Sequence, residues 1–312
     1  MAALPRPIVT GPWLGEVGFE LLYWIPFLRW FAGRFGVGPD RLVVISRGGT
    51  ASWYESLSTR YCDVFEDVST ETFRRQHDER IRAVGEQKQR RVSEFDQAVV
   101  ESAARRRQLT EWSLLHPSVM YELFDPYWWG HVSGDWVHEH ASYARLPEPV
   151  SDVLAETPRP YVAVKFYFND CFPATEANRS FARQVLHAVA ARGPVVALST
   201  GLNIDDHGGV RVDDLGVRYL PAGLEPAANL AVQSAVVSRA RAFVGTYGGF
   251  SYLAPFYGVK SVAVFSEPDG FSRKHLDAAQ SGFARIGASG LLSIDDVATN
   301  PLMADRAWTV TT

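Results

Sequence analysis

Residues 242–265 read AFVGTYGGFSYLAPFYGVKSVAVF, and this stretch decides the fold class. The apolar run at 242–245 predicts a buried strand that ends in a glycine-rich turn at Gly248 and Gly249. A short helix from Phe250 and a second apolar strand at 261–265 follow. Strand, turn, helix and strand in this order are typical of a parallel sheet covered by helices.

The same alternation extends back from this stretch to about residue 158. Three further strands and two helices are predicted there, the strands at 161–166, 195–199 and 217–220 and the helices at 175–192 and 226–240. The second half of the chain is therefore expected to form a Rossmann-like domain with a parallel sheet.

The first half predicts a second α/β domain with a helical insertion. Its strands are expected at 8–10, 41–46, 61–68 and 112–115. Apolar residues between Phe19 and Phe31 recur with helical spacing, and Pro26 is expected to kink that helix or to begin a second segment. The charged stretch 69–107 predicts solvated helices, with a basic patch for an anionic acceptor as the alternative.

Proline-rich sequence between 145 and 160 predicts the domain boundary. We expect an N-terminal domain at 1–157 and a C-terminal domain at 158–312, two Rossmann-like domains that face each other across a cleft. The chain has 312 residues, about twice the length of a typical domain of ~150 residues.

Charge and cysteine content point to a soluble cytoplasmic protein. The formal net charge of −4 argues against nucleic acid as the main partner. Cys62 and Cys171 lie far apart, which favours a reducing compartment over a disulfide scaffold. No signal-peptide pattern follows Pro7, and charges interrupt the apolar stretch 19–35, so at most peripheral membrane contact is expected.

The glycine-rich turn is the strongest candidate for a binding site. Ligands of α/β folds bind at the carboxyl edge of the sheet, and a helix N-terminus suits a phosphate. The chain has neither a P-loop nor a G-x-G-x-x-G motif at its first strand–helix turn, which disfavours ATP and NAD. A tight turn without a ligand is the alternative. The predicted donors are the backbone and hydroxyl groups of Thr246, Tyr247, Gly248, Gly249, Phe250 and Ser251.

The 242–265 stretch resembles the nucleotide-sugar half of GT-B glycosyltransferases, in particular heptosyltransferase-like enzymes. In those enzymes a strand, a glycine-containing turn, a small helix and a further strand build the donor diphosphate site. The loop 11–18 and the helix after it look like the acceptor-side opening of the same fold. The chain departs from the heptosyltransferase pattern at Tyr247-Gly248-Gly249, where that family has an acidic residue and a Ser or Thr before the glycine. The identity of the donor therefore does not carry over.

Two cations are candidates for neutralising a diphosphate. Lys165 ends the first predicted strand of the second half and Arg179 lies in the next helix, with surface cations as the alternative. The resemblance favours Lys165. Ser199 and Thr200 follow the next strand and are candidates for contacts with base or ribose. The resemblance implies that Glu267 accepts hydrogen bonds from ribose hydroxyls.

On the acceptor side, inverting sugar transfer needs a base that deprotonates the attacking hydroxyl. Similar enzymes carry an acid in the first glycine-rich loop, so the resemblance implies Glu16, with Glu20 in reserve and Gly15 and Gly18 shaping the loop. A helix cap is the alternative role for Glu16. Aromatic residues between 121 and 136 are predicted mainly as core, with acceptor contacts as the alternative.

No stretch has the spacing of a metal site. His138-Glu139-His140 is read as a surface loop, and Asp205-Asp206-His207 and Asp295-Asp296 form no convincing ligand set. The resemblance implies diphosphate binding by helix dipoles and cations, so no metal and no cofactor is expected besides the nucleotide-diphosphate sugar as co-substrate.

The predicted function is glycosyl transfer from that donor to a glycan, a lipid-linked glycan or a small-molecule acceptor. Three alternatives stay open: a nucleotide-sugar epimerase or hydrolase, a non-catalytic nucleotide-sugar-binding protein, and a nucleic-acid role for the basic stretch 74–107.

Overall fold

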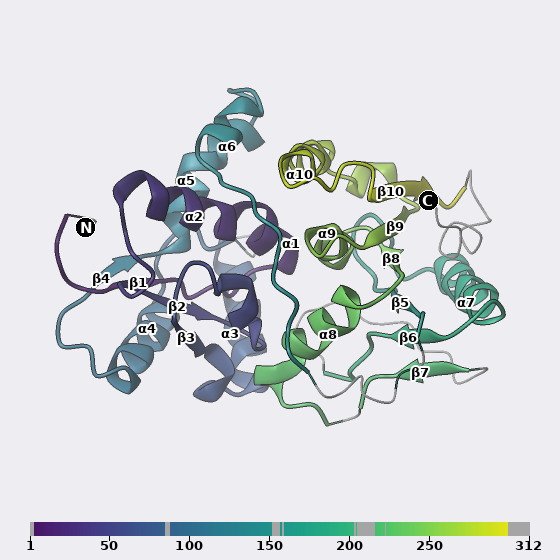
Figure 1. Cartoon of the computed structure of the whole chain (residues 1–312), viewed down its shortest axis with the longest axis horizontal. Coiled ribbons are helices and arrows are strands. Elements are labelled where there is room, and N and C mark those ends of the chain that lie inside the picture. Colours follow the sequence, from purple (N-terminus) through teal and green to yellow (C-terminus); the bar gives the residue numbers. More distant parts are fainter. Residues whose placement is uncertain are drawn as a thin grey trace. The chain divides into compact units, whose positions relative to one another are not determined.

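The computed structural model describes residues 3–84, 88–151, 157, 159–202, 204, 216–221 and 223–298. The chain forms two compact units, Met1–Pro147 with Glu225–Ala231, and Glu148–Leu224 with Val232–Thr312. Each unit contains one sheet in which all neighbouring strands run parallel, which confirms the predicted α/β class (Figure 1). The units divide at Pro147 and Glu148 rather than at the expected 157 and 158, and Pro158 and Asp205-Asp206-His207 lie outside the described residues.

The first unit is built on a four-stranded sheet in the order β3-β2-β1-β4. Its strands are β1 (Ile8–Thr10), β2 (Leu42–Ser46), β3 (Arg60–Asp63) and β4 (Ser113–Leu115). Every residue of β1 and β2 is buried, as their apolar runs predict. The strand expected at 61–68 ends earlier, because the Asp63 carboxylate accepts the Phe65 N–H and starts the 3₁₀ turn η3 (Val64–Glu66).

One long helical segment follows β1. It runs through α1 (Val17–Phe19), the π-helix η1 (Glu20–Trp24) and α2 (Ile25–Phe35). Pro26 lies in the first turn of α2, directly after the π-helical turn, and its missing N–H leaves a carbonyl of that turn without its helical partner. The predicted second segment is therefore present, and a π-helical turn precedes it.

The remaining helices of the first unit are η2 (Thr50–Tyr54), α3 (Thr70–Val84), α4 (Glu94–Arg106), α5 (Pro117–Trp128) and α6 (Asp135–Glu139). Figure 1 shows α2 and α5 on one side of the sheet and α3 and α4 on the other. The interpretation of residues 138–140 as a surface loop is wrong, since His138 and Glu139 end α6. Tyr121, Phe124 and Tyr127 of α5 are buried, which confirms the core interpretation for them, whereas Trp129 is 69% exposed.

A short piece from the second half of the sequence belongs to the first unit. The N–H groups of Leu230 and Ala231 both donate to the Gly48 carbonyl, at 2.8 and 2.9 Å. A Cβ on Gly49 would lie 2.5 Å from the Ala227 carbonyl oxygen, and the φ of Gly49 is +79°. Only glycine permits this close approach of two backbones.

The second unit is built on a six-stranded sheet in the order β10-β9-β8-β5-β6-β7. Its strands are β5 (Val162–Lys165), β6 (Val195–Ala197), β7 (Val217–Tyr219), β8 (Ala242–Thr246), β9 (Lys260–Phe265) and β10 (Leu292–Asp296). Its helices are α7 (Glu176–Ala190), α8 (Asn229–Ser238), α9 (Gly249–Phe256), η6 (Pro268–Gly270) and α10 (Arg273–Arg285). The 3₁₀ turn η5 (Pro226–Ala228) and the first three residues of α8 belong to the first unit. Figure 1 shows α8 and α9 on one side of the sheet and α7 on the other.

In each sheet, successive strands are first added on one side of the first strand and later on its other side, so the strand order reverses once. The second sheet extends from β5 to β7 on one side and from β8 to β10 on the other, so the order reverses between β5 and β8. The first sheet reverses between β1 and β4. In open parallel sheets, a crevice for ligands forms at the carboxyl ends of the strands at such a reversal. The strand order therefore marks one candidate site in each unit.

No helix among the described residues is long and apolar enough to span a membrane. Cys62 and Cys171 are both buried and unbridged.

Candidate functional site

Lys165 lies at the reversal point of the second sheet. It is the last residue of β5, and its register partner on β8 is Gly245. Its Nζ donates to Gln233 Oε1 at 2.5 Å and lies 3.8 Å from the centre of the Phe250 ring. Because Phe250 is in the first turn of α9, the Lys165 charge is held beside the positive end of that helix dipole.

The turn before α9 is closely packed. The Gly248 N–H donates to Ser251 Oγ at 3.1 Å, and the Ser251 hydroxyl donates back to the Gly248 carbonyl at 2.8 Å. A Cβ on Gly248 would lie 2.1 Å from the Tyr167 hydroxyl oxygen, and the φ of Gly248 is +148°. Glycine is therefore required here. The N–H groups of Gly249 and Phe250 follow, at positions where a helix has no internal acceptor for them.

Three predicted hydroxyl donors are engaged within the protein instead. The Thr246 hydroxyl donates to the Tyr167 carbonyl at 2.8 Å and accepts the Tyr167 N–H at 3.0 Å. The Tyr247 hydroxyl contacts Tyr252 Oη at 2.5 Å and the Ser272 carbonyl at 3.3 Å. Ser251 caps the helix as described above. The turn itself therefore uses these three hydroxyls, and their contact with a ligand stays a prediction.

The loop after β5 supports the turn and was missed at the sequence level. Asn169 Nδ2 donates to the Tyr247 carbonyl at 3.2 Å, and Asn169 Oδ1 accepts the Phe172 N–H at 2.9 Å. Burial raises the pKa of the Cys171 thiol to about 11, so this thiol stays neutral. The loop's position directly after the strand that carries Lys165 was the available signal.

Gln233 was also missed. Its signal is a polar residue within an otherwise apolar helix, NLAVQSAVVS, and it is 1% exposed. A buried amide in such a helix needs a polar partner, and Lys165 is that partner.

The other predicted donor-side residues lie around the same edge. Ser199 and Thr200 follow β6 and are half-buried, and Glu267 follows β9 with an exposed side chain. Arg179 lies on α7 with its guanidinium 4.5 Å from the centre of the Phe168 ring. Since β9, β8, β5 and β6 are neighbours, the structure brings the ends of these strands to one edge of the sheet.

At the reversal point of the first sheet, Glu16 occupies the N-cap position of α1. Its side chain is exposed and makes no capping hydrogen bond. The capping role considered for it is therefore not seen. Gly15 and Gly18 are both buried, Gly15 beside the Trp13 ring and Gly18 inside α1.

Glu20 is fully buried. Its Oε1 accepts hydrogen bonds from Ser46 Oγ and Tyr54 Oη, both at 2.5 Å. Burial raises the pKa of Glu20 to about 7, although these two hydrogen bonds and the nearby Arg47 charge act to lower it. Glu20 is closed off from solvent, unlike Glu16.

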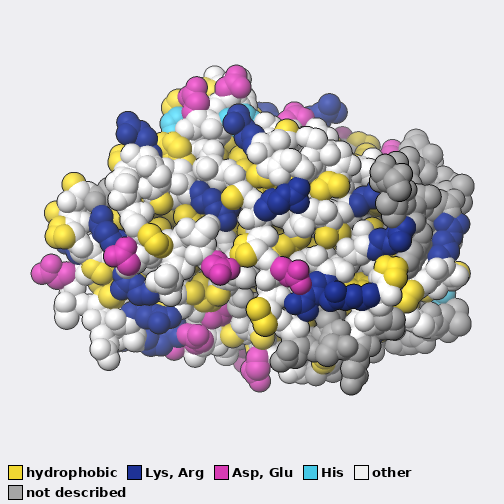
Figure 2. Space-filling model, viewed as in Figure 1, with side chains coloured by type: hydrophobic (Ala, Val, Ile, Leu, Met, Phe, Trp, Pro, Cys, Tyr) yellow, Lys and Arg dark blue, Asp and Glu magenta, His cyan; other side chains and the backbone are white. Residues whose placement is uncertain are grey.

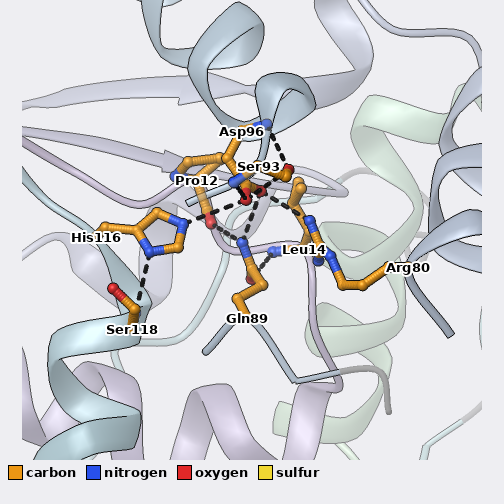
Figure 3. Close-up of polar contacts among 8 residues, drawn as sticks. All are labelled: Pro12, Leu14, Arg80, Gln89, Ser93, Asp96, His116 and Ser118. Carbon is orange, nitrogen blue, oxygen red and sulfur yellow. Dashed lines mark hydrogen bonds and ion pairs between the residues drawn. The ribbon is translucent and has the colours of Figure 1, made fainter. Parts of the chain in front are cut away.

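A buried polar cluster lies beside Glu16's loop and also escaped prediction (Figure 3). Asp96 is 0% exposed, and its carboxylate contacts Arg80, Gln89 and Ser93. The Nε2 of His116, which follows β4, lies 3.5 Å from Asp96 Oδ2. Burial acts to raise the pKa of Asp96, but His116 and Arg80 outweigh it, so the pKa lies below its ordinary value. The stretch 69–107 contains helices as predicted, but in addition to solvated faces it contributes residues to this buried cluster.

A pocket of about 540 Å³ also lies in this helical part of the first unit. Its lining contains the basic residues Arg80, Lys88, Arg90 and Arg91 and the acidic residues Glu79 and Glu94. Lys88 Nζ lies 5.5 Å from the centre of the Phe19 ring. The excess of positive charge suits an anionic group.

Within the ranges that the structure describes, no group of three or more His, Cys, Asp or Glu side chains is arranged to hold a metal ion.

Comparison with known proteins finds no matching family model and no matching curated protein. The structure is similar to Escherichia coli heptosyltransferase WaaC with ADP, with a TM-score of 0.46, 11% identity and 93% of each chain covered. It is similar to E. coli ADP-heptose LPS heptosyltransferase II, with a TM-score of 0.47, 12% identity, and 93% of this chain and 90% of that chain covered. A glycosyl transferase family 9 protein of Veillonella parvula gives a TM-score of 0.48 at 12% identity, with 100% of this chain and 92% of that chain covered.

Proposed function

We propose that this protein is a glycosyltransferase that takes its sugar from a nucleotide-diphosphate sugar. The observation that carries the proposal is the convergence of Lys165 and the N-terminus of α9 at the reversal point of the second sheet. A cation and free helix N–H groups at this position match the two negative charges of a diphosphate.

The same groups suit the chemistry of transfer. When the bond between the sugar and the diphosphate breaks, negative charge grows on the leaving diphosphate. Lys165 and the N–H groups of Gly249 and Phe250 stabilise that charge from fixed positions, without a metal ion. Glu267 and Ser199, after the neighbouring strands, are the proposed contacts for ribose and base.

Glu16 is the proposed base. It combines an exposed carboxylate with a position at the reversal point of the first sheet. Glu20 does not suit this role, because its carboxyl group is buried and bonded to Ser46 and Tyr54. The proposed acceptor is a hydroxyl of a glycan, a lipid-linked glycan or a small molecule.

Ligand binding tests the first half of the proposal. The protein is heated with UDP, GDP, ADP, CMP and dTDP and with sugars of each series. A ligand at about 100 times its Kd adds about 2.7 kcal/mol to the free energy of unfolding. Stabilisation by one nucleotide series is expected, weaker in Lys165→Met. A wild-type protein that no nucleotide stabilises would overturn the donor site.

Turnover with the stabilising donor tests the second half. Release of nucleotide only when an acceptor is present supports transfer. Release without acceptor identifies a hydrolase, conversion to an isomeric donor identifies an epimerase, and binding without any turnover identifies a non-catalytic protein. Activity is expected to persist in EDTA.

Nucleic acid is a less suitable ligand. The formal net charge of the chain is −4, whereas phosphate-backbone binding uses a basic surface. On the face in view, Figure 2 shows Lys and Arg side chains interspersed with Asp and Glu side chains.

A further inference from the structure

Gln89 is a buried residue whose side-chain amide is fully occupied by one loop and one carboxylate. It is 1% exposed and lies between α3 and α4. Its Oε1 accepts the Leu14 N–H at 2.9 Å, and its Nε2 donates to the Pro12 carbonyl at 2.9 Å and to Asp96 Oδ1 at 3.1 Å (Figure 3). The amide thus contacts the loop backbone on both sides of Trp13.

Further hydrogen bonds from side chains and from the backbone fix the position of this loop. The Trp13 N–H donates to the Ile45 carbonyl at 2.9 Å, and the Arg47 guanidinium donates to the Gly15 carbonyl at 2.7 Å. The Glu16 carbonyl accepts the Trp13 indole N–H at 3.3 Å and the Glu20 N–H at 3.1 Å. The backbone is therefore held from Pro12 to Glu16, while the Glu16 side chain is exposed.

Asp96 fixes the orientation of the amide. Its Oδ1 accepts hydrogen bonds from Gln89 and from Arg80, and Ser93 donates to its Oδ2 through both N–H and hydroxyl. A carboxylate accepts only, so the NH₂ group of Gln89 must face Asp96 and the oxygen must face Leu14. The orientation that suits Asp96 is also the one that suits the loop.

Buried polar groups cost free energy unless every one is bonded. An apolar side chain would fill the place of Gln89 at lower cost, but it would leave the Leu14 N–H and the Pro12 carbonyl without these partners. The use of an amide and an ionised carboxylate here serves the position of the loop more than the packing of the core.

We propose that Gln89, oriented by Asp96, is a positioning residue that holds the Glu16 carboxylate where it meets the acceptor hydroxyl. This inference rests on the proposed function. A displacement of about 1 Å at a reacting group lowers turnover by about 100-fold.

The test compares Gln89→Met with His116→Asn. Methionine matches the length of glutamine but bonds neither Leu14 nor Pro12. Asparagine at 116 retains a cap for the Ser118 N–H, as His116 Nδ1 provides now, and removes the ring that faces Asp96. Turnover, the KM for donor and the hydrogen exchange of the Leu14 amide are measured for both, well below their melting temperatures.

Gln89→Met is expected to lower kcat about 100-fold with an unchanged KM for donor and faster exchange at Leu14. His116→Asn is expected to keep kcat within about threefold of the wild type, because Arg80 and Ser93 still bond the Asp96 carboxylate and the Gln89 contacts with the loop stay in place. A wild-type kcat in Gln89→Met, or equal losses in both variants, would overturn the inference. A wild-type protein without transfer activity would instead overturn the proposed function.

Gln89→Glu covers the case in which Gln89→Met does not fold. A protonated glutamic acid can accept the Leu14 N–H and donate to the Pro12 carbonyl or to Asp96, whereas the ionised form would face two acceptors. The kcat of this variant should therefore fall with rising pH more steeply than that of the wild type. Parallel pH profiles would contradict the positioning role.

Discussion

The carboxyl edges of the two sheets share a topology and differ in chemistry. Each strand order reverses once, between β1 and β4 in the first unit and between β5 and β8 in the second. The first reversal point carries the carboxylate of Glu16 on a loop whose backbone is held by Gln89. The second carries the Lys165 ammonium beside a helix N-terminus. The topology provides the place for a site, and the side chains decide whether that site suits a base or an anion.

The two edges also expose different parts of the chain. In the first unit, Gln89 and Arg47 hold the backbone of the loop 12–16, and the Glu16 side chain on this loop is exposed. In the second unit, Gln233 and Phe250 hold the Lys165 side chain, and the backbone of the α9 turn provides the remaining proposed donors. Variants at each edge therefore test distinct functions, turnover at the first and donor binding at the second.

The largest expected effect is that of Glu16→Gln. Removal of a general base costs about 100- to 10,000-fold in kcat, while donor binding should be unchanged because it depends on the second unit. Single-turnover rates and donor titrations of this variant check both expectations. An equal loss of turnover and donor affinity would remove the distinction drawn between the edges.

Glu20→Gln is expected to change how stability depends on pH. The folded pKa of about 7 lies above the ordinary glutamate value of 4.5, so the folded state retains the proton to higher pH than the unfolded state does. The resulting stability is fully present below pH 4.5 and is lost as the pH rises to about 7, by on the order of 3 kcal/mol. Urea unfolding between pH 4.5 and 8 should show this decline in the wild type and a flatter profile in Glu20→Gln. Identical profiles would mean that Glu20 does not titrate there.

Gly248→Ala tests the packing of the α9 turn. The new Cβ would lie 2.1 Å from the Tyr167 hydroxyl at a φ of +148°, so a loss of about 2 kcal/mol of stability is expected, with weaker donor binding. Tyr167→Phe in the same chain removes the hydroxyl and should recover part of that loss. Thermal melts of the single and double variants measure the recovery, and its absence would assign the loss to backbone strain alone.

Lys165→Met has the smallest expected effect. Methionine can keep the contact with Phe250 but carries no charge, so donor affinity should fall about tenfold, or about 1.4 kcal/mol. Affinity for the free nucleoside, which has no diphosphate, should not change. Calorimetric titration with the donor and with the free nucleoside shows whether the loss of affinity depends on the diphosphate. An equal loss of affinity for both ligands would exclude a contact between Lys165 and the diphosphate.

Local patterns were sufficient to predict most of the strands and the α9 turn. The runs at 41–46, 161–166 and 261–265 are apolar enough to identify buried strands within one or two residues of β2, β5 and β9. The strand β10 was not predicted, because two of its five residues are acidic. Four of the five residues are only half-buried, so the strand has no long apolar run. The helix α10 was missed as well.

The sequence by itself determined the α/β class, the parallel sheets and the glycine-rich turn, because these follow from periodicity and from neighbouring residues. Glu16 and Lys165 were selected as candidates through the resemblance to GT-B glycosyltransferases. Only the tertiary structure decided which polar groups are buried together. Gln89 bonds Leu14 across 75 positions of the chain and Lys165 bonds Gln233 across 68, and no local pattern encodes such pairs. Tertiary contacts likewise direct the Thr246 hydroxyl to the Tyr167 backbone, since a buried hydroxyl bonds to the nearest polar group.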